Sequence, residues 1–258
     1  MKSSHPEIGS PRLLVVGAGF LGGAVARGAS TGGWSVVPVV RSEKSANLLK
    51  AEFPGVIHGN AVDPLFWREF DGRWEGLVWS VSPSRDEESS FDELHRNGAH
   101  QAALWAGERG VPMIYISSTS VYAEAEGGWV DEGSPLARHD ERSMALVEAE
   151  RSALRVGGSV LRCGGIYGPG RELRGSQEGP ERWVNVVQVE DAARAVGFVL
   201  GKKRQVFNVC EDVPLKRGVP GGQWPEGRRG RRNKRVSNAK LRGLGWQPLW
   251  SGGGRSSV

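Results

Sequence analysis

Cysteine is almost absent from this chain of 258 residues. Only Cys163 and Cys210 occur, far apart and outside any Cys-x-x-Cys spacing. Two such cysteines cannot form the disulfide framework of a small secreted domain or the ligand set of a structural zinc site. We therefore expect a protein of a reducing compartment, the cytoplasm.

Long apolar runs are also missing. The first clear run, at residues 13–16, is short and leads directly into glycines, whereas a membrane-spanning helix needs about 20 apolar residues. A secretory leader would carry an apolar region of about 7–15 residues near the start, and none is seen. The sequence predicts no membrane partner.

Positive charge is concentrated in one stretch. The net charge is +5, but residues 216–242 contain ten Lys or Arg and a single acid, Glu226, so the rest of the chain is negative. One basic stretch rich in Gly and Pro is more often a solvated loop than a nucleic-acid surface. We predict a surface segment and no nucleic-acid partner; the sequence does not set the oligomeric state.

Short apolar runs alternate with stretches of helical period. The predicted strands are 13–16, 35–40, 56–57, 77–81, 113–116, 159–162 and 205–209, and the predicted helices are 20–30, 42–53, 91–105, 144–154 and 191–200. This alternation is typical of a parallel sheet covered by helices. The predicted fold class is α/β, a Rossmann-type doubly wound parallel sheet with a small C-terminal substrate-binding part.

The two parts can be assigned to residue ranges. We place the dinucleotide-binding core at residues 1–170 and the smaller part at 171–258, with 185–210 returning to the core. Residues 214–230 show turn formers and charge without any periodicity, which predicts a linker or surface loop.

A glycine turn, Gly17-Ala18-Gly19-Phe20-Leu21-Gly22, follows the first strand. Gly17 permits a tight turn, Gly19 lets the backbone approach a pyrophosphate, and Gly22 allows close packing of helix on strand. Phe20 and Leu21 begin the helix whose N-terminus would face the phosphates. In this context the motif predicts a dinucleotide site; the alternative is a structural tight turn.

The residue at the end of the second strand distinguishes two cofactors. An Asp or Glu there would accept hydrogen bonds from the ribose of NAD, but this chain has Arg41. A guanidinium suits the 2′-phosphate of NADP, and Ser42 and Lys44 are close enough to assist. We predict NADP in preference to NAD. The alternative is that Arg41 is a solvated charge and Glu43 contacts the ribose.

Longer motifs follow the third, fifth and sixth strands. They read Gly-Asn-Ala-Val-Asp at 59–63, Ile-Ser-Ser-Thr-Ser-Val-Tyr at 116–122 and Leu-Arg-Cys-Gly-Gly-Ile-Tyr-Gly-Pro-Gly-Arg at 161–171; two more lie at 189–195 and 234–248. With these motifs the chain resembles, over nearly its whole length, the NAD-dependent epimerase/dehydratase branch of the extended short-chain dehydrogenase/reductase superfamily.

The resemblance implies roles for two residues. Asn60 would contact adenine, in a place where the family usually has Asp. Ser118 would hold the substrate oxygen by a hydrogen bond. The alternative for Ser118 is a strand-end hydroxyl that caps the next segment.

The residues that most members of this superfamily use for proton transfer are missing. The resemblance implies a Tyr followed four positions later by a Lys, and the family's spacing from Glu132 puts Arg142 and Leu146 there. None of the three tyrosines has a Lys at that spacing. Arg142 is a poor proton donor, but it could bind an anionic substrate group or stabilise an oxyanion.

Four other groups near this region could transfer protons, although each is also explained as a surface charge: Glu124, Glu126, His139 and Asp140. The chain contains no His-Glu-x-x-His and no Gly-x-Ser-x-Gly motif, so neither metal-assisted nor serine-triad hydrolysis is indicated.

The sequence therefore predicts an NADP-linked oxidoreductase, or an epimerase/dehydratase-like enzyme, that acts on a small polar or sugar-like substrate polarised by Ser118 and Arg142. The alternative is a non-catalytic NADPH-binding protein with a regulatory or sensor role.

Overall fold

The structure is a computed structural model that describes residues 9–83, 91–138, 140–173, 179–220, 222–223, 233–251 and 255–256. The chain divides into two compact units, and both are assembled from segments distant in sequence. Unit 1 comprises Met1–Ile116, Glu148–Val160 and Val199–Gln205; unit 2 comprises Ser117–Val147, Leu161–Phe198 and Val206–Val258. The functional division near residue 170 stays a prediction.

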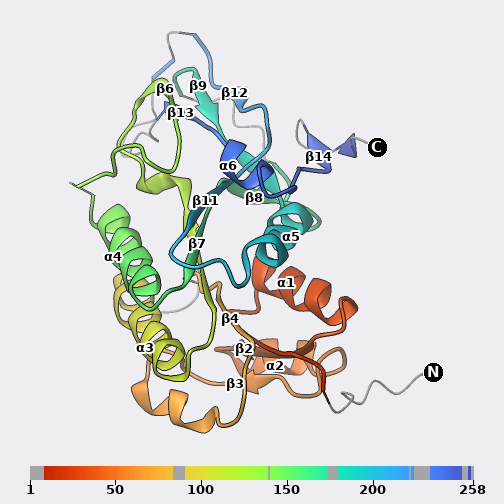
Figure 1. The fold of residues 1–258 in the computed structure, drawn as a ribbon. Coiled ribbons are helices and arrows are strands. Elements are labelled where there is room, and N and C mark those ends of the chain that lie inside the picture. Colours follow the sequence, from red (N-terminus) through yellow and green to blue (C-terminus); the bar gives the residue numbers. More distant parts are fainter. Residues whose placement is uncertain are drawn as a thin grey trace. The chain divides into compact units, whose positions relative to one another are not determined.

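Seven strands form one sheet in the order β11-β7-β5-β4-β1-β2-β3 (Figure 1). Their bounds are β1 Arg12–Val16, β2 Ser35–Val40, β3 Ile57–His58, β4 Gly76–Trp79, β5 Met113–Ser118, β7 Ser159–Cys163 and β11 Val206–Val209. The pairs β5–β4, β4–β1, β1–β2 and β2–β3 are parallel. The strand order reverses between β1 and β4, as in a doubly wound sheet. The predicted Rossmann-type fold is confirmed.

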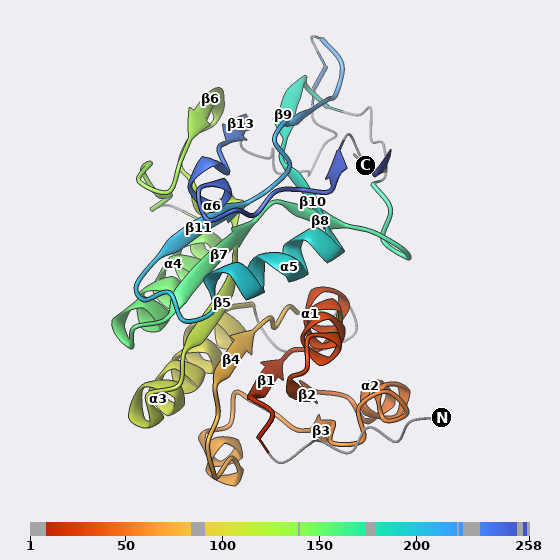
Figure 2. The same cartoon turned by 45° about the vertical axis from the view of Figure 1, so that its right-hand side comes forward.

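The central strands are apolar along their whole length because they are covered on both faces. In unit 1, all four residues of β4 are buried, and so are the last four of β1. Helices α1 (Phe20–Thr31) and α3 (Ala99–Arg109) lie on opposite sides of these strands (Figure 1, Figure 2).

Two predicted helices differ from the observed ones. Helix α2 spans Glu43–Leu49, and the Ser42 side chain caps it by accepting a hydrogen bond from the Ser45 amide. It ends four residues before the predicted end. The predicted helix 91–105 is divided into a π-helix, Glu93–Gly98, and α3.

Unit 2 carries elements that the sequence did not predict. They are β6 Glu126–Val130, β8 Gly165–Tyr167, β9 Arg182–Val184, β10 Val186–Gln188, β12 Leu215–Arg217, β13 Asn233–Val236, α6 Ala239–Arg242, β14 Trp250–Ser251 and β15 Arg255–Ser256. The strands pair as β10–β8, β12–β9, β13–β6 and β14–β15. Such short strands show no measurable period, so only their partners define them.

The expectation for the basic stretch 216–242 is partly wrong. Residues 215–217 form strand β12 rather than a loop, because they pair with β9. Lys234 in β13 is buried, with 5% of its surface exposed. The four arginines between positions 228 and 232 lie outside the described residues.

The last two motifs of the sequence meet in unit 2. Asp191, in helix α5 (Val189–Val199), is fully buried and its Oδ2 accepts hydrogen bonds from the amides of Leu249 (2.9 Å) and Trp250 (3.1 Å). The Trp246 indole donates to the Asp191 carbonyl oxygen at 3.0 Å. The carboxylate therefore fixes the segment that follows Trp246 against α5. The remaining long helix, α4, spans Glu141–Arg155.

Among the described helices, none is both long and apolar enough to cross a membrane. Within the same residues, no three His, Cys, Asp or Glu side chains gather in a way that could hold a metal ion.

Candidate functional site

The glycine turn joins β1 to α1 at the carboxyl end of the strand. Gly17 has a φ of +86°, and a Cβ added there would lie 2.7 Å from the backbone of Ser80, which follows β4. A Cβ added to Gly22 would lie 2.2 Å from the Gly17 carbonyl oxygen. Both positions therefore require glycine, and the turn lies where the strand order reverses.

The N-terminus of α1 is open. Gly19 is the residue before the helix, and no side chain caps the helix there. A Cβ added to Gly19 would meet no atom within 4 Å, and the first turn contains no acidic residue. A helix start that carries partial positive charge and no side-chain cap is suited to an anionic group. These residues fit the pyrophosphate of a dinucleotide.

The two residues after Gly19 have different surroundings. Leu21 is buried, with 6% of its surface exposed, and Phe20 is half-buried. Leu21 therefore packs into the core of unit 1 with its side chain, and only its backbone amide belongs to the open helix start.

The end of β2 contacts both the glycine turn and the segment 59–63. The amides of Gly17 and Ala18 donate to the Val39 carbonyl at 3.0 and 3.1 Å, and the Gly59 amide donates to Val40 at 3.0 Å. Arg41, which is exposed, follows immediately. The structure thus brings Arg41 to the loop edge that carries the glycine turn.

Asn60 is exposed in the neighbouring loop. Its Oδ1 accepts a hydrogen bond from the Val62 amide at 3.3 Å, so this side-chain oxygen helps to stabilise the loop itself. An amide side chain retains two N–H donors for other partners. Ser42 differs, because its Oγ is used to cap α2.

Ser118 ends β5 and belongs to unit 2. Its Oγ accepts a hydrogen bond from the Ser120 amide at 3.1 Å and caps a single 3-10 turn, Thr119–Val121. The alternative role predicted for Ser118, a strand-end hydroxyl that caps the next segment, is therefore observed. A hydroxyl that accepts through a lone pair keeps its own hydrogen for donation, so the cap and a substrate contact are compatible.

Arg142 is exposed in the first turn of α4. The next residue, Ser143, is buried, and its Oγ lies 3.1 Å from the Ser120 carbonyl and 2.5 Å from Asp140 Oδ2. This contact holds the start of α4 against the turn that begins at Ser118. Leu146 is 4% exposed and packs in the core, so a hydrophobic side chain fills the position of the family's Lys.

All three tyrosines are buried and hydrogen-bonded. Tyr115 lies 2.7 Å from His95 Nδ1, Tyr122 donates to Asn208 Oδ1 at 2.6 Å, and Tyr167 donates to Glu211 Oε1 at 2.5 Å. Burial raises the pKa of each hydroxyl, that of Tyr122 to about 12. A tyrosine that transfers protons beside a lysine, as the resemblance implies, needs the opposite shift. These tyrosines stay protonated at neutral pH.

The neighbouring acids have structural partners. Glu124 Oε1 accepts from the amides of Glu126 (2.8 Å) and Gly128 (3.1 Å), and these backbone hydrogen bonds lower the Glu124 pKa. Asp140 Oδ2 also accepts from the Ser143 amide at 3.3 Å. Glu124 is thus a poor proton donor. His139 lies outside the described residues.

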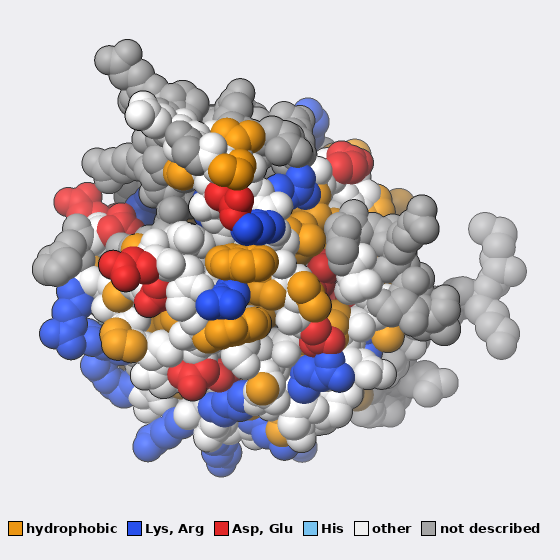
Figure 3. All heavy atoms as spheres, turned by 90° about the horizontal axis from the view of Figure 1, so that it is seen from above, with side chains coloured by type: hydrophobic (Ala, Val, Ile, Leu, Met, Phe, Trp, Pro, Cys, Tyr) orange, Lys and Arg blue, Asp and Glu red, His pale blue; other side chains and the backbone are white. Residues whose placement is uncertain are grey.

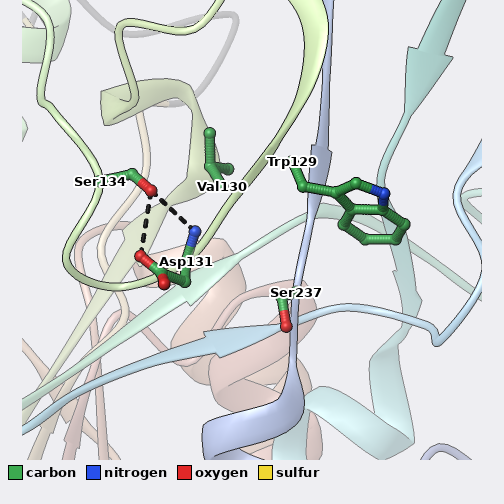
Figure 4. A pocket seen from close by; sticks show the side chains of 5 residues that line it. All are labelled: Trp129, Val130, Asp131, Ser134 and Ser237. Atoms are coloured by element: carbon green, nitrogen blue, oxygen red, sulfur yellow. Dashed lines mark hydrogen bonds between the residues drawn. The ribbon is translucent and has the colours of Figure 1, made fainter.

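Unit 2 also contains an open pocket that no sequence motif indicated. Its volume is about 420 Å³, and its lining residues are Trp129, Val130, Asp131, Ser134 and Ser237. Figure 4 shows the hydrogen-bonded Asp131 and Ser134 on one side of β13, the Trp129 indole on the other, and Ser237 between them. The residues come from segments about a hundred positions apart, so only the pairing of β6 with β13 assembles them.

Comparison with known proteins shows which proteins this fold resembles. No family model matches the chain. Protein YeeZ of Escherichia coli (strain K12) is 26% identical over 229 residues, which cover 81% of this chain and 80% of YeeZ. UDP-glucose 4-epimerase of Thermotoga maritima, solved with UDP-glucose, is 18% identical with a TM-score of 0.77, covering 93% of this chain and 94% of the epimerase.

A third relative was solved with NAD bound. It is DesIV, the dTDP-glucose 4,6-dehydratase of Streptomyces venezuelae, which is 20% identical with a TM-score of 0.74 and covers 93% of this chain and 92% of its own. These likenesses show that the chain has the fold of the NAD-dependent epimerases and dehydratases. The fold that the resemblance implied is confirmed.

Proposed function

We propose that this chain is an NADP-linked oxidoreductase, or an epimerase/dehydratase-like enzyme, that acts on a small polar or sugar-like substrate. One observation carries the proposal. The glycine turn leads to an α1 N-terminus that no side chain caps, and the β2 end beside it carries Arg41 in place of an acid. The structural relatives solved with NAD and with UDP-glucose support a dinucleotide and a sugar-like substrate.

Three parts of unit 1 would hold the cofactor. The amides of the first turn of α1 would bind the pyrophosphate, Arg41 would pair with the 2′-phosphate, and Asn60 would contact adenine. The nicotinamide ring supplies or accepts hydride when it is bound. The protein's contribution is to bind and orient that ring and to polarise the substrate.

Two residues of unit 2 would act on the substrate. The Ser118 hydroxyl, fixed by the Ser120 amide, would donate its hydrogen to a carbonyl or hydroxyl oxygen. The Arg142 guanidinium would bind an anionic group or a developing oxyanion. No tyrosine takes part in proton transfer, since all three are buried, hydrogen-bonded and raised in pKa.

Calorimetric titration with NADPH and NADH tests the cofactor assignment. We expect tighter NADPH binding by roughly tenfold to a hundredfold, since one charge-assisted contact contributes about 1.5–3 kcal/mol. Arg41→Ala should abolish the preference. Arg73→Ala is the matched control, because the Arg73 side chain is 89% exposed and forms an ion pair with Glu75. Equal affinities, or a preference that survives in Arg41→Ala, would refute the assignment.

The catalytic roles need a substrate, to be found with a panel of small carbonyl compounds and sugars. Ser118→Ala should then lower kcat by about tenfold to a thousandfold, because it removes one polarising donor. Arg142→Ala should chiefly raise KM if it anchors an anionic group. Full activity in Ser118→Ala would remove that residue from the mechanism.

A second candidate function is a non-catalytic NADPH sensor. The observation that favours it is Leu146, which fills the Lys position with a buried side chain, so the usual proton relay cannot form. Stoichiometric NADPH binding without turnover anywhere in the panel would support the sensor. Turnover that depends on Ser118 would exclude it.

A further inference from the structure

An alternating row of indole and basic side chains crosses the surface of unit 2. It comprises Lys216 (β12), Trp183 (β9), Arg235 (β13) and Trp129 (β6), and we refer to it as the indole ladder. The Arg235 guanidinium lies 5.2 Å from the Trp129 ring centre and 5.5 Å from that of Trp183, and Lys216 Nζ lies 5.9 Å from Trp183. Figure 3 shows hydrophobic and basic side chains alternating on this face.

The ladder is held in place by contacts with the backbone. Arg235 Nε donates to the Gly127 carbonyl at 2.8 Å, and the Trp183 amide donates to Asn233 Oδ1 at 2.8 Å. Lys216 also forms an ion pair with Glu181. These contacts fix the Arg235 guanidinium and the backbone at Trp183 before any ligand arrives, which reduces the entropy that binding would cost.

Trp129 remains 55% exposed although Arg235 covers one of its faces. Its second face is therefore open to solvent. Five other tryptophans are buried, with no more than 6% of their surfaces exposed: Trp67, Trp74, Trp79, Trp105 and Trp246. Tryptophans are enriched at interfaces, so this exposed indole, which continues the row formed by Trp183 and Arg235, marks a candidate binding surface.

The pocket beside Trp129 offers oxygen atoms. Asp131 Oδ1 accepts from Ser134 Oγ at 3.0 Å and from the Gly133 amide at 3.0 Å, which fixes the Asp131 carboxylate. Ser237 contributes a further hydroxyl between this pair and the indole (Figure 4). The arrangement places an open aromatic face on one side of an open pocket and hydrogen-bonding groups on the other.

The charge of this surface is mixed. The basic residues Lys216 and Arg235 are accompanied by the carboxylates Glu126, Asp131 and Glu181 on or next to the same strands. A polyanion such as a nucleic acid would meet these carboxylates, so the described residues of this surface do not form a basic groove of the kind that follows a phosphate backbone. The surface suits a neutral ligand rich in hydroxyl groups.

We propose that the open face of Trp129 and the adjoining pocket bind a neutral oligosaccharide. One sugar ring would stack its C–H face on the indole, because the π face of an aromatic ring is electron-rich and attracts weakly positive C–H groups. The next sugar would place its hydroxyls against Ser237, Ser134 and Asp131. This site lies outside the residues assigned to cofactor and catalysis, and it does not depend on the proposed redox function.

Calorimetry and saturation-transfer NMR on the full chain test the proposal, with maltotetraose, cellotetraose and chitotetraose as probes at millimolar concentration. We expect at least one tetrasaccharide to bind, and its monosaccharide to bind more weakly. Trp129→Ala should weaken binding by about tenfold, whereas Trp129→Phe should retain most of it because a ring remains. Leu65→Ala, which removes a side chain that is 58% exposed in unit 1, is the control and should bind normally.

Three outcomes would overturn the proposal. These are no saccharide binding by the wild-type chain, equal binding by Trp129→Ala with an unchanged Tm, and binding of heparin or oligo(dT) instead of the saccharides. In the last case a loss of polyanion binding in Trp129→Ala would show that the ladder recognises anions.

Discussion

Replacing Tyr122 with phenylalanine tests whether this tyrosine is structural. Its hydroxyl donates to Asn208 Oδ1 at 2.6 Å and accepts from Arg162 Nη1 at 3.1 Å, and all three side chains are buried. Arg162 also lies 5.0 Å from the Tyr122 ring centre. Tyr122→Phe keeps the ring, and with it the packing and the cation–π contact. It removes only the hydroxyl and leaves Asn208 Oδ1 without this donor.

The loss of stability has two sources: Asn208 Oδ1 becomes a buried acceptor without this donor, and Arg162 loses its hydrogen bond to the hydroxyl. An unsatisfied buried group costs about 1–3 kcal/mol, and hydrogen bonds to charged groups lie in the upper part of that range. We therefore expect a loss of about 2–3 kcal/mol in the free energy of unfolding. For a chain of this size that corresponds to a fall in Tm of about 4–12 °C.

The pH dependence gives a second measurement. Burial raises the Tyr122 pKa to about 12, above the value of about 10 expected in the unfolded chain. The stability that the neutral hydroxyl contributes is therefore present below about pH 10 and is lost as pH rises toward about 12. The difference in stability between wild type and Tyr122→Phe should shrink over that interval.

Differential scanning calorimetry at pH 7 to 11 measures both effects, with Leu48→Ala as a surface control, since Leu48 is 74% exposed. A double-mutant cycle with Asn208→Ala isolates the coupling between the two side chains. A Tm within about 1 °C of wild type would refute the reasoning, given the expected shift per kcal/mol. Collapse of turnover with an alkaline shift of the pH profile, at unchanged Tm, would show that Tyr122 transfers protons after all.

Three further predictions follow from single contacts. Gly22→Ala should abolish NADPH binding and lower Tm, because its Cβ would lie 2.2 Å from the Gly17 carbonyl oxygen; unchanged affinity by calorimetry would contradict this. Asp191→Asn should cost about 2–4 kcal/mol, because an amide nitrogen would face the amide donors of the C-terminal segment or the Arg194 guanidinium, which Asp191 binds at 2.8 Å. Faster hydrogen exchange at Leu249 and Trp250 should accompany it, and protection equal to wild type would count against the contact. Burial raises the pKa of Cys163 to about 12 and that of Cys210 as well, so neither thiol should react with a thiol reagent in the native protein at pH 8, whereas both should react in urea.

The sequence alone determined the central sheet and the glycine turn that follows its first strand. Strand bounds were predicted to within two residues, because fully buried parallel strands appear as continuous apolar runs between turn residues. The Ser42 cap of α2 is likewise a local feature, since capping depends on residues only three positions apart. The glycines at 17 and 22 were recognised in the same way, because the steric demand they meet recurs in every such turn.

Tertiary structure alone decided the environment of the chemical groups. Tyr122 forms hydrogen bonds with Asn208, 86 positions away, and with Arg162, 40 positions away. The periodicity of the local sequence cannot predict such contacts. The short strands that assemble the indole ladder exist only as pairs. Local patterns encode which face of an element is apolar, whereas the partners of a polar side chain, and therefore its pKa, depend on how distant segments pack.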